Sequence, residues 1–284
     1  MRRPDPRISQ KIAFAILLLS TLFVLVPAGL IVLVIIKNGL GAVTWEFLTT
    51  APRNGMREGG ILPAMVGTAC LVVGAMSVAI PLGVLSAIYL NEYAGQNLLT
   101  RVIKLAIINL AGIPSVVYGL FGMGIFVIFL KFGASILAGS LTLAIMNLPV
   151  IITATREALA SVPQSFREVS LSLGASKWQT IRHVVLPNSI PGILTGIILE
   201  ISRAAGETAP ILFTVAAFYL PGLPTSVFDQ VMALPMHLYA ISTQIPNIEL
   251  EVRYATALVL LGLVFGVNSM AIIIRAKLRR KKAW

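Results

Sequence analysis

Six long apolar stretches, separated by short polar segments, set the pattern of this chain. A helix rises about 1.5 Å per residue, so about 20 apolar residues cross the hydrocarbon core of a bilayer. Every stretch meets that length, and the pattern predicts an all-α integral membrane protein with six transmembrane helices. The stretches cover residues 12–36, 61–90, 104–131, 132–155, 187–219 and 253–275.

Basic residues precede the first stretch, as they do in a secretory signal peptide. A cleavable signal, however, has an apolar region of about 7–15 residues, and the run over 12–36 is longer. We therefore expect this segment to remain in the protein as an uncleaved anchor.

The composition is typical of a membrane protein. Hydrophobic residues make up 57% of the 284 positions and charged residues 12%, whereas a soluble domain carries about 25% charged residues. The net charge of +11 does not indicate nucleic acid, because the basic residues flank the apolar stretches and no patch interleaves them with aromatic residues. The single cysteine, Cys70, cannot form an internal disulfide, and we expect it to serve packing.

Lysine and arginine are unevenly distributed between the polar segments. If both termini face the cytoplasm, sixteen of the 22 basic residues lie in cytoplasmic segments and five in external ones, with Arg203 inside the fifth stretch. The positive-inside bias favours this orientation and places the long polar loop in the cytoplasm. The external segments are then 37–60, 131–135 and 220–251. Within the last of these we expect a short helix over 227–240, with His237 on its surface.

The long polar loop, residues 156–187, is expected to contain helices. Ser165 and Glu168 have the S-x-x-E spacing of a capping box, which predicts the start of a helix. Gly174 suits the position just after a helix C-terminus. Apolar residues at i, i+3 and i+7 predict one stripe on this helix: Phe166, Val169 and Leu173.

A second short helix is expected to follow. Ser176 and Gln179 can cap its start, and Pro187 and Pro191 are expected to separate it from the fifth span. Two short amphipathic helices that meet at a glycine form a compact knob suited to a soluble partner. The alternative is a pair of helices that lies on lipid headgroups. The apolar stripe of the second helix consists of Trp178, Ile181 and Val185.

The spacing within this loop resembles the EAA loop of ABC importer permeases. Glu168 and Gly174 match the pattern E-A-A-x-x-x-G, and after nine residues Val184-x-Leu186-Pro187 matches I-x-L-P, although Val169 and Ser170 stand where alanines are usual. The resemblance implies a type I ABC importer transmembrane domain whose coupling helix seats in a groove of a cytoplasmic ATPase. The residues to which it assigns this role are Ser165, Phe166, Arg167, Glu168, Val169, Leu173, Gly174, Ala175, Trp178 and Pro187.

Charged residues interrupt the fifth apolar stretch. At about 100° per residue, Glu200, Arg203 and Glu207 share one narrow face of a helix, together with Gly196 and Thr214. A charge at this depth costs about 2.5–3.5 kcal/mol on insertion scales, so such groups pair with one another or face water. The trio therefore indicates a gate or a substrate path, and a purely structural ion pair is the alternative.

Residues 203–210 resemble the R-A-x-G-E-T-A-P segment of phosphate-specific transport (Pst) permeases. Residues 58–68 are similar to the segment before the second span of the A-type subunit of that family, and residues 90–93 and 113–119 also resemble family segments. The resemblance implies a substrate path that includes Thr208, and import of inorganic phosphate. Arginine suits phosphate because of its fork of donors, so we expect Arg203 to meet phosphate and to pair with Glu207 otherwise.

The resemblance also implies the partners: a cytoplasmic ABC ATPase dimer, a sibling permease, an extracytoplasmic phosphate-binding protein and membrane lipid. The chain has no G-x-x-x-x-G-K-[ST] pattern, so it is expected to be the translocating part of an ATP-driven pump rather than an enzyme in itself. We expect no metal and no cofactor, and a bacterial plasma membrane location.

Three segments organise the chain: residues 1–60 with the first span, a permease core over 61–275, and a basic tail over 276–284. A permease for another anion (phosphonate, sulfate or molybdate) remains an alternative. A channel or secondary carrier is disfavoured, because it needs no structured cytoplasmic knob. A membrane scaffold without transport is disfavoured by the charged trio, and an intramembrane hydrolase by the absence of paired Asp or of a Ser/His arrangement within the spans.

Overall fold

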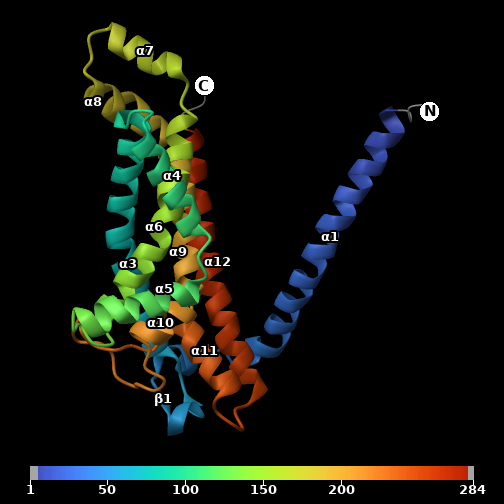
Figure 1. Cartoon of the computed structure of the whole chain (residues 1–284). Helices are drawn as coiled ribbons and strands as arrows, with labels where there is room; N and C mark the ends of the chain where they lie inside the picture. The colour runs from blue at the N-terminus through green and yellow to red at the C-terminus, as the bar shows by residue number, and fades with distance from the viewer. Residues whose placement is uncertain (1–5, 281–284) are drawn as a thin grey trace.

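The computed structural model describes residues 6–280, which leaves Arg2, Arg3, Lys281 and Lys282 outside the described part. A bundle of upright helices forms the body of the molecule, and one long helix, α1, leans away from it (Figure 1). The upright helices are α3 (Leu62–Ile88), α4 (Leu98–Ala111), α6 (Ile136–Ala160), α9 (Leu186–Gly206) and α12 (Leu250–Arg280), and α1 covers Pro6–Gly39. Helix α5 (Ser115–Gly122) lies crosswise at one end of the bundle, where it packs against the short helix α10 (Ala209–Thr214) (Figure 1).

Five described helices are long and apolar enough to cross a membrane by themselves, and a bent pair of helices makes a sixth span if it counts as one. The prediction of a helical membrane protein with six spans is confirmed. The third span is not one straight helix, however. Its two parts, α4 and α5 with the π-helical turn η4 (Met123–Phe129), meet at 103°. The first part ends at Ala111, Pro114 occupies the N-cap position of α5, and the Tyr118 hydroxyl donates to the Leu110 carbonyl at 2.8 Å across the bend.

The fifth span differs from the expected range at both ends. A continuous helix runs through α8 (Lys177–Thr180), the π-helical turn η5 (Ile181–Val185) and α9, and it ends at Gly206. The expectation that Pro187 and Pro191 separate the loop from the span is therefore wrong. Pro187 lies in the first turn after η5, where a missing backbone N–H is tolerated.

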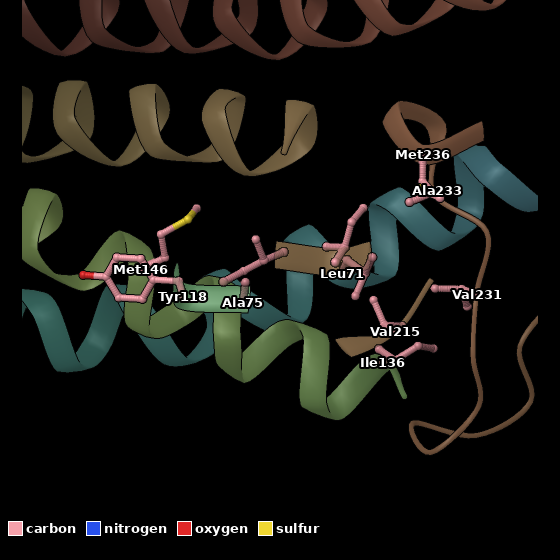
Figure 2. Packing of buried hydrophobic residues seen from close by; sticks show 11 residues of the cluster. Leu71, Ala75, Tyr118, Ile136, Met146, Val215, Val231, Ala233 and Met236 are labelled. Atoms are coloured by element: carbon pink, nitrogen blue, oxygen red, sulfur yellow. The ribbon is translucent and has the colours of Figure 1, made fainter. Parts of the chain in front are cut away.

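Helix α6 is the centre of the bundle, with α3 and α9 packed against it. Gly196 of α9 lies against Ala154 of α6, where an added Cβ would come within 2.4 Å of the alanine side chain. Small residues therefore let the two helices approach closely, as is common in membranes. Gly119 and Gly122 of α5 are close-packed in the same way, whereas Gly124 has no side-chain neighbour within 4 Å. Figure 2 shows a buried apolar cluster that joins α3, α5, α6 and α10 with residues of the segment 231–236.

The helices α7 (Gln164–Ser172) and α8 lie at one end of the bundle, and the described ends of α1 and α12 point to the same end (Figure 1). At the opposite end, residues 40–60 and 220–249 form what we call the distal cap. It contains η1 (Leu40–Ala42), α2 (Trp45–Thr49), a hairpin of β1 (Pro52–Arg53) and β2 (Glu58–Gly59) around η2 (Asn54–Met56), and α11 (Leu234–Thr243).

Within the distal cap, the helix expected over 227–240 begins later, at Leu234. A turn occupies the preceding segment, because the Asp229 carboxylate accepts hydrogen bonds from the backbone N–H groups of Thr225 and Ser226. These bonds lower the pKa of Asp229. An aspartate that binds backbone donors of the residues before it favours a turn over a helix.

His237 is buried, so its expected place on the surface is wrong. Its Nδ1 has no hydrogen-bond partner among the described residues, and it lines a cavity of about 290 Å³ together with Glu46, Arg57 and Glu58. Burial lowers the pKa of His237 to about 4. The neutral ring is therefore the form that the folded cap accommodates.

The distal cap is expected to loosen in acid. Because the pKa of His237 is lower in the fold than in the unfolded chain, the fold is fully stabilised above pH 6.5 and loses stability as the pH falls towards 4. The total loss is roughly 3 kcal/mol. Hydrogen exchange of residues 220–249 at pH 7 and pH 4.5 measures it. His237→Gln should remove the pH dependence, whereas His183→Gln, at an exposed site, should keep it; equal acid sensitivity in both variants would contradict this account.

Candidate translocation site and coupling loop

The charged trio of the fifth span is brought together in the structure. Arg203 Nε lies 3.3 Å from Glu207 Oε1, and Arg203 Nη1 lies 4.0 Å from Glu200 Oε2. Glu200 is buried, whereas the Arg203 side chain is 37% exposed. The guanidinium is thus held between two carboxylates while part of it faces away from the chain. The expected Arg203–Glu207 pair is confirmed.

The helical face expected for the trio is only partly correct. Helix α9 ends at Gly206, and Glu207 has an extended backbone, with φ −69° and ψ 135°. Thr208 precedes the short helix α10, so Thr214 belongs to a different helix from Glu200 and Arg203. Pro210, in the first turn of α10, accounts for the break. A proline has no backbone N–H to donate within a continuous helix, and it restricts the backbone of the residue before it, Ala209. Glu207 therefore reaches Arg203 from an interrupted backbone.

Helix α10 packs against α5 near the distal end of the bundle (Figure 1). A Cβ added at Gly119 would come within 3.0 Å of Pro210 Cα, so the two short helices touch through their backbones. Two broken spans thus meet beside the trio. Irregular backbone at membrane depth is tolerated where it is buried in protein or lines a cavity, and it is a common setting for substrate passage.

The long polar loop, residues 156–187, which we call the coupling loop after its expected role, presents an exposed apolar surface. Val169 and Trp178 are more than half exposed, and Leu173 is 83% exposed. Glu168, Ser165 and Gly174 are exposed beside them. An exposed apolar group of this kind on a polar loop is typical of a site for a protein partner.

Helix α7 begins two residues earlier than expected. Its first residue is Gln164, Pro163 occupies the cap position, and no side chain caps the backbone there, so the expected capping box of Ser165 and Glu168 is wrong. Pro163 has no side-chain acceptor for capping, and its fixed φ, here −56°, leads the backbone into the helix. The end of the helix is as expected: Gly174 has φ +85°, and the N–H groups of Gly174 and Ala175 reach the carbonyls of Leu171 and Ser170.

The second predicted helix start is confirmed, with the Ser176 and Gln179 side chains forming a reciprocal capping box. The two apolar stripes, however, are divided between the core and the surface. Ile181 and Val185 are buried with the partly buried Phe166, whereas Trp178 is exposed. Each predicted stripe thus packs some of its apolar residues against the bundle and leaves the others exposed.

Arg167 is directed inward, although it is one of the residues expected to couple to an ATPase. Its Nη2 lies 2.9 Å from Glu92 Oε1, and it also donates to the carbonyls of Val162 and Leu159. Ala175 and Pro187 are half-buried. The loop therefore has an outward surface and an inward set of contacts.

Residues 79–280 match the family described as "Binding-protein-dependent transport system inner membrane component". The chain belongs to this family. It is accordingly the membrane component, a permease subunit, of a binding-protein-dependent transport system, and the chain is not itself the catalytic part.

Individual relatives cover most of this permease. It is 38% identical over 271 residues to the phosphate transport system permease protein PstA of Mycobacterium leprae, an alignment that covers 92% of this chain and 87% of the relative. It is 34% identical over 262 residues to the probable phosphate transport system permease protein PstA of Methanocaldococcus jannaschii, covering 92% and 91%. A probable ABC transporter permease, YqgI of Bacillus subtilis, is 35% identical, covering 82% and 84%.

Solved ABC transporter structures have the same fold. A chain of a bacterial transporter for the acidic polysaccharide alginate superposes with a TM-score of 0.61 at 15% identity, covering 94% of this permease and 99% of that chain. A chain of the MetNI methionine transporter gives 0.58 at 17% identity, covering 77% and 94%. The expected type I ABC importer fold is confirmed.

Two features of this permease were not expected from its sequence. Glu92 lies in one of the segments that resembles the family, but no local pattern connects it with Arg167, 75 positions away. The burial of His237 was missed because a lone histidine among prolines indicates a surface loop. An acidic residue at the end of an apolar stretch was the one signal available for Glu92.

Proposed function

We propose that this permease is a transmembrane subunit of an ATP-driven importer of inorganic phosphate. The observation that carries the proposal is the setting of Arg203, a partly exposed guanidinium held by Glu207 at a break after a membrane span. A guanidinium fork binds a tetrahedral oxyanion through paired hydrogen bonds. The relatives from Mycobacterium and Methanocaldococcus that are named as phosphate permeases support the choice of anion.

In this proposal phosphate competes with the carboxylates for Arg203. The only side-chain hydrogen bond of Arg203 within residues 6–280 uses Nε, towards Glu207, which leaves the Nη donors for an anion. When phosphate leaves, the Glu207 carboxylate pairs with Arg203 again, so the charge of the guanidinium is neutralised after each passage. Glu200 holds the guanidinium from the other side, and Thr208 lies beside the break. Transient rather than tight binding suits a pump, since an external binding protein supplies selectivity.

The coupling loop in this proposal is the contact with a cytoplasmic ABC ATPase dimer. The exposed side chains of Val169, Leu173 and Trp178, together with the exposed Glu168, support a docking surface for a protein. The loop, both termini and most of the basic residues then lie in the cytoplasm, and the distal cap faces the phosphate-binding protein. A sibling permease completes the path, and lipid surrounds the assembly in the bacterial plasma membrane.

Uptake of radiolabelled phosphate by vesicles that contain the whole complex tests the substrate. We expect ATP-dependent uptake that unlabelled phosphate inhibits and that sulfate, molybdate and a phosphonate at equal concentration leave unchanged. ATP-dependent uptake that one of the other anions inhibits as strongly as phosphate would instead assign that anion. The same vesicles without the binding protein are the control for leakage.

A further inference from the structure

We infer that Arg167 and Glu92 are positioning residues that fasten the coupling loop to the inner end of α3, so that a displacement of the loop moves α3 with it. The inference rests on the proposed function, in which an ATPase acts on that loop. Glu92 belongs to the π-helical turn η3 (Tyr89–Tyr93), and Arg167 belongs to α7. The two residues are 75 positions apart in the chain, so their contact joins segments that are distant in sequence.

The ion pair between Arg167 and Glu92 is bidentate and largely buried. Arg167 Nη2 lies 2.9 Å from Glu92 Oε1 and Nε lies 3.4 Å from Oε2, so both carboxylate oxygens are engaged. Arg167 Nη1 donates to the Val162 carbonyl at 2.7 Å and Nη2 to the Leu159 carbonyl at 2.8 Å. One guanidinium thus joins η3, α7 and the end of α6. The Arg167 side chain is 12% exposed and that of Glu92 8%, so water screens the pair weakly.

A second contact holds the same turn from α8. The ammonium group of Lys177 lies 5.0 Å from the centroid of the Tyr93 ring, within the range of a cation–π interaction. Two consecutive residues of η3, Glu92 and Tyr93, are therefore held by the two helices of the coupling loop. The Arg167–Glu92 and Lys177–Tyr93 contacts therefore fix α7 and α8 to one turn of the bundle, in addition to their apolar packing.

The Arg167–Glu92 ion pair lies beside a cavity and is not surrounded on all sides by packed side chains. A cavity of about 580 Å³ adjoins it, with Asn91, Glu92, Arg167 and Lys177 in its wall. On one side, therefore, space rather than packed side chains separates the loop from η3. Other contacts of α7 with the rest of the chain include the partly buried Phe166 and a hydrogen bond between the Ser170 and Thr180 hydroxyl groups.

Helix α3 can carry the displacement across the molecule. Residues 62–93 form one continuous helical span, and α3 packs along α6. At its far end, the Thr68 hydroxyl oxygen accepts a hydrogen bond from the Leu234 N–H of the distal cap at 2.8 Å. Along its length, α3 shares a buried cluster with Ala204, the neighbour of Arg203. A movement of η3 therefore reaches both the charged trio and the distal cap.

The experiment measures coupling rather than activity alone. In vesicles that contain the whole complex, the number of phosphate ions imported per ATP hydrolysed is compared between wild type, Glu92→Gln and Arg167→Gln. We expect both variants to retain the ATPase subunits and at least half of the ATP hydrolysis, with the import ratio reduced about tenfold. Glu157→Gln and Arg101→Gln, which remove the same charges from exposed positions at the inner end, should leave the ratio unchanged.

A merely structural pair would give a different result. Import and hydrolysis would then fall together at a constant ratio, and that outcome overturns the inference. Should the single variants fail to assemble, Glu92→Cys/Arg167→Cys in a Cys70→Ser background replaces the link by a short thiol crosslinker. Recovery of the ratio on crosslinking supports the inference, and efficient crosslinking without recovery overturns it. A wild-type complex that imports no phosphate would instead refute the proposed function, so the two failures are distinguishable.

Discussion

Arg203→Gln is expected to reduce ATP-driven phosphate uptake by about 100-fold while the permease still assembles with its partners. Two charge-assisted hydrogen bonds to phosphate, at about 1.5 kcal/mol each, are lost with the guanidinium. Assembly survives because the Arg203 side chain is 37% exposed and takes no part in the apolar core. Initial uptake rates in vesicles that contain equal amounts of complex give the measurement.

A double variant separates the translocation role from a structural ion pair. If Arg203 only compensates the buried carboxylate of Glu200, Glu200→Gln/Arg203→Gln removes the unpaired charge and uptake recovers. If Arg203 meets phosphate, the double variant stays as inactive as Arg203→Gln. Arg203→Lys keeps the charge and loses the planar fork, so we expect intermediate uptake. Full uptake with Arg203→Gln would remove this residue from the mechanism.

Leu173→Asp is expected to detach the ATPase subunits from the permease. Leu173 is 83% exposed in the free chain, and its burial against a partner contributes about 1.5–3 kcal/mol. An aspartate at this position also places a desolvated charge in the contact, so the loss of affinity is expected to exceed about 100-fold. Co-purification of the ATPase subunits with tagged permease measures this loss.

The matched control for the coupling loop is Leu223→Asp. Leu223 is an exposed leucine of the distal cap, at the opposite end of the molecule from α7, so the ATPase subunits should remain bound. Retention of the ATPase by the Leu173 variant would show that α7 is not the docking helix. If the loop helices instead lie on lipid headgroups, Leu173→Asp should leave the ATPase subunits bound and should weaken the contact of the loop with the lipid surface.

The hydrophobic pattern was sufficient for the number of spans but not for their shape. Length and apolar composition predict that a segment crosses the membrane, whereas a bend depends on particular contacts. The 103° angle between α4 and α5 is held by a hydrogen bond from Tyr118 to Leu110, and no periodicity reveals it. The continuous helix through Pro187 was missed for a related reason, because the π-helical turn before it accommodates the proline.

The candidate site was predictable where its residues are close in sequence. Arg203 and Glu207 are four positions apart, and their pairing followed from helical geometry, even though the helix ends between them. Gly174 at the end of α7 followed from the conformational freedom of glycine. The Arg167–Glu92 contact depends on the packing of helices distant in sequence, so the inward direction of Arg167 required the structure.

Uptake of phosphate as a function of nucleotide tests the central claim, which is that an ATP-driven displacement of the coupling loop opens a path beside Arg203. Vesicles with the wild-type complex should accumulate phosphate only when hydrolysable ATP is present on the face that carries α7 and α8. A complex with Glu168→Ala and Gly174→Val, which strains a backbone at φ +85°, should accumulate none. Uptake at the full rate without nucleotide, or with both substitutions in place, would contradict the account.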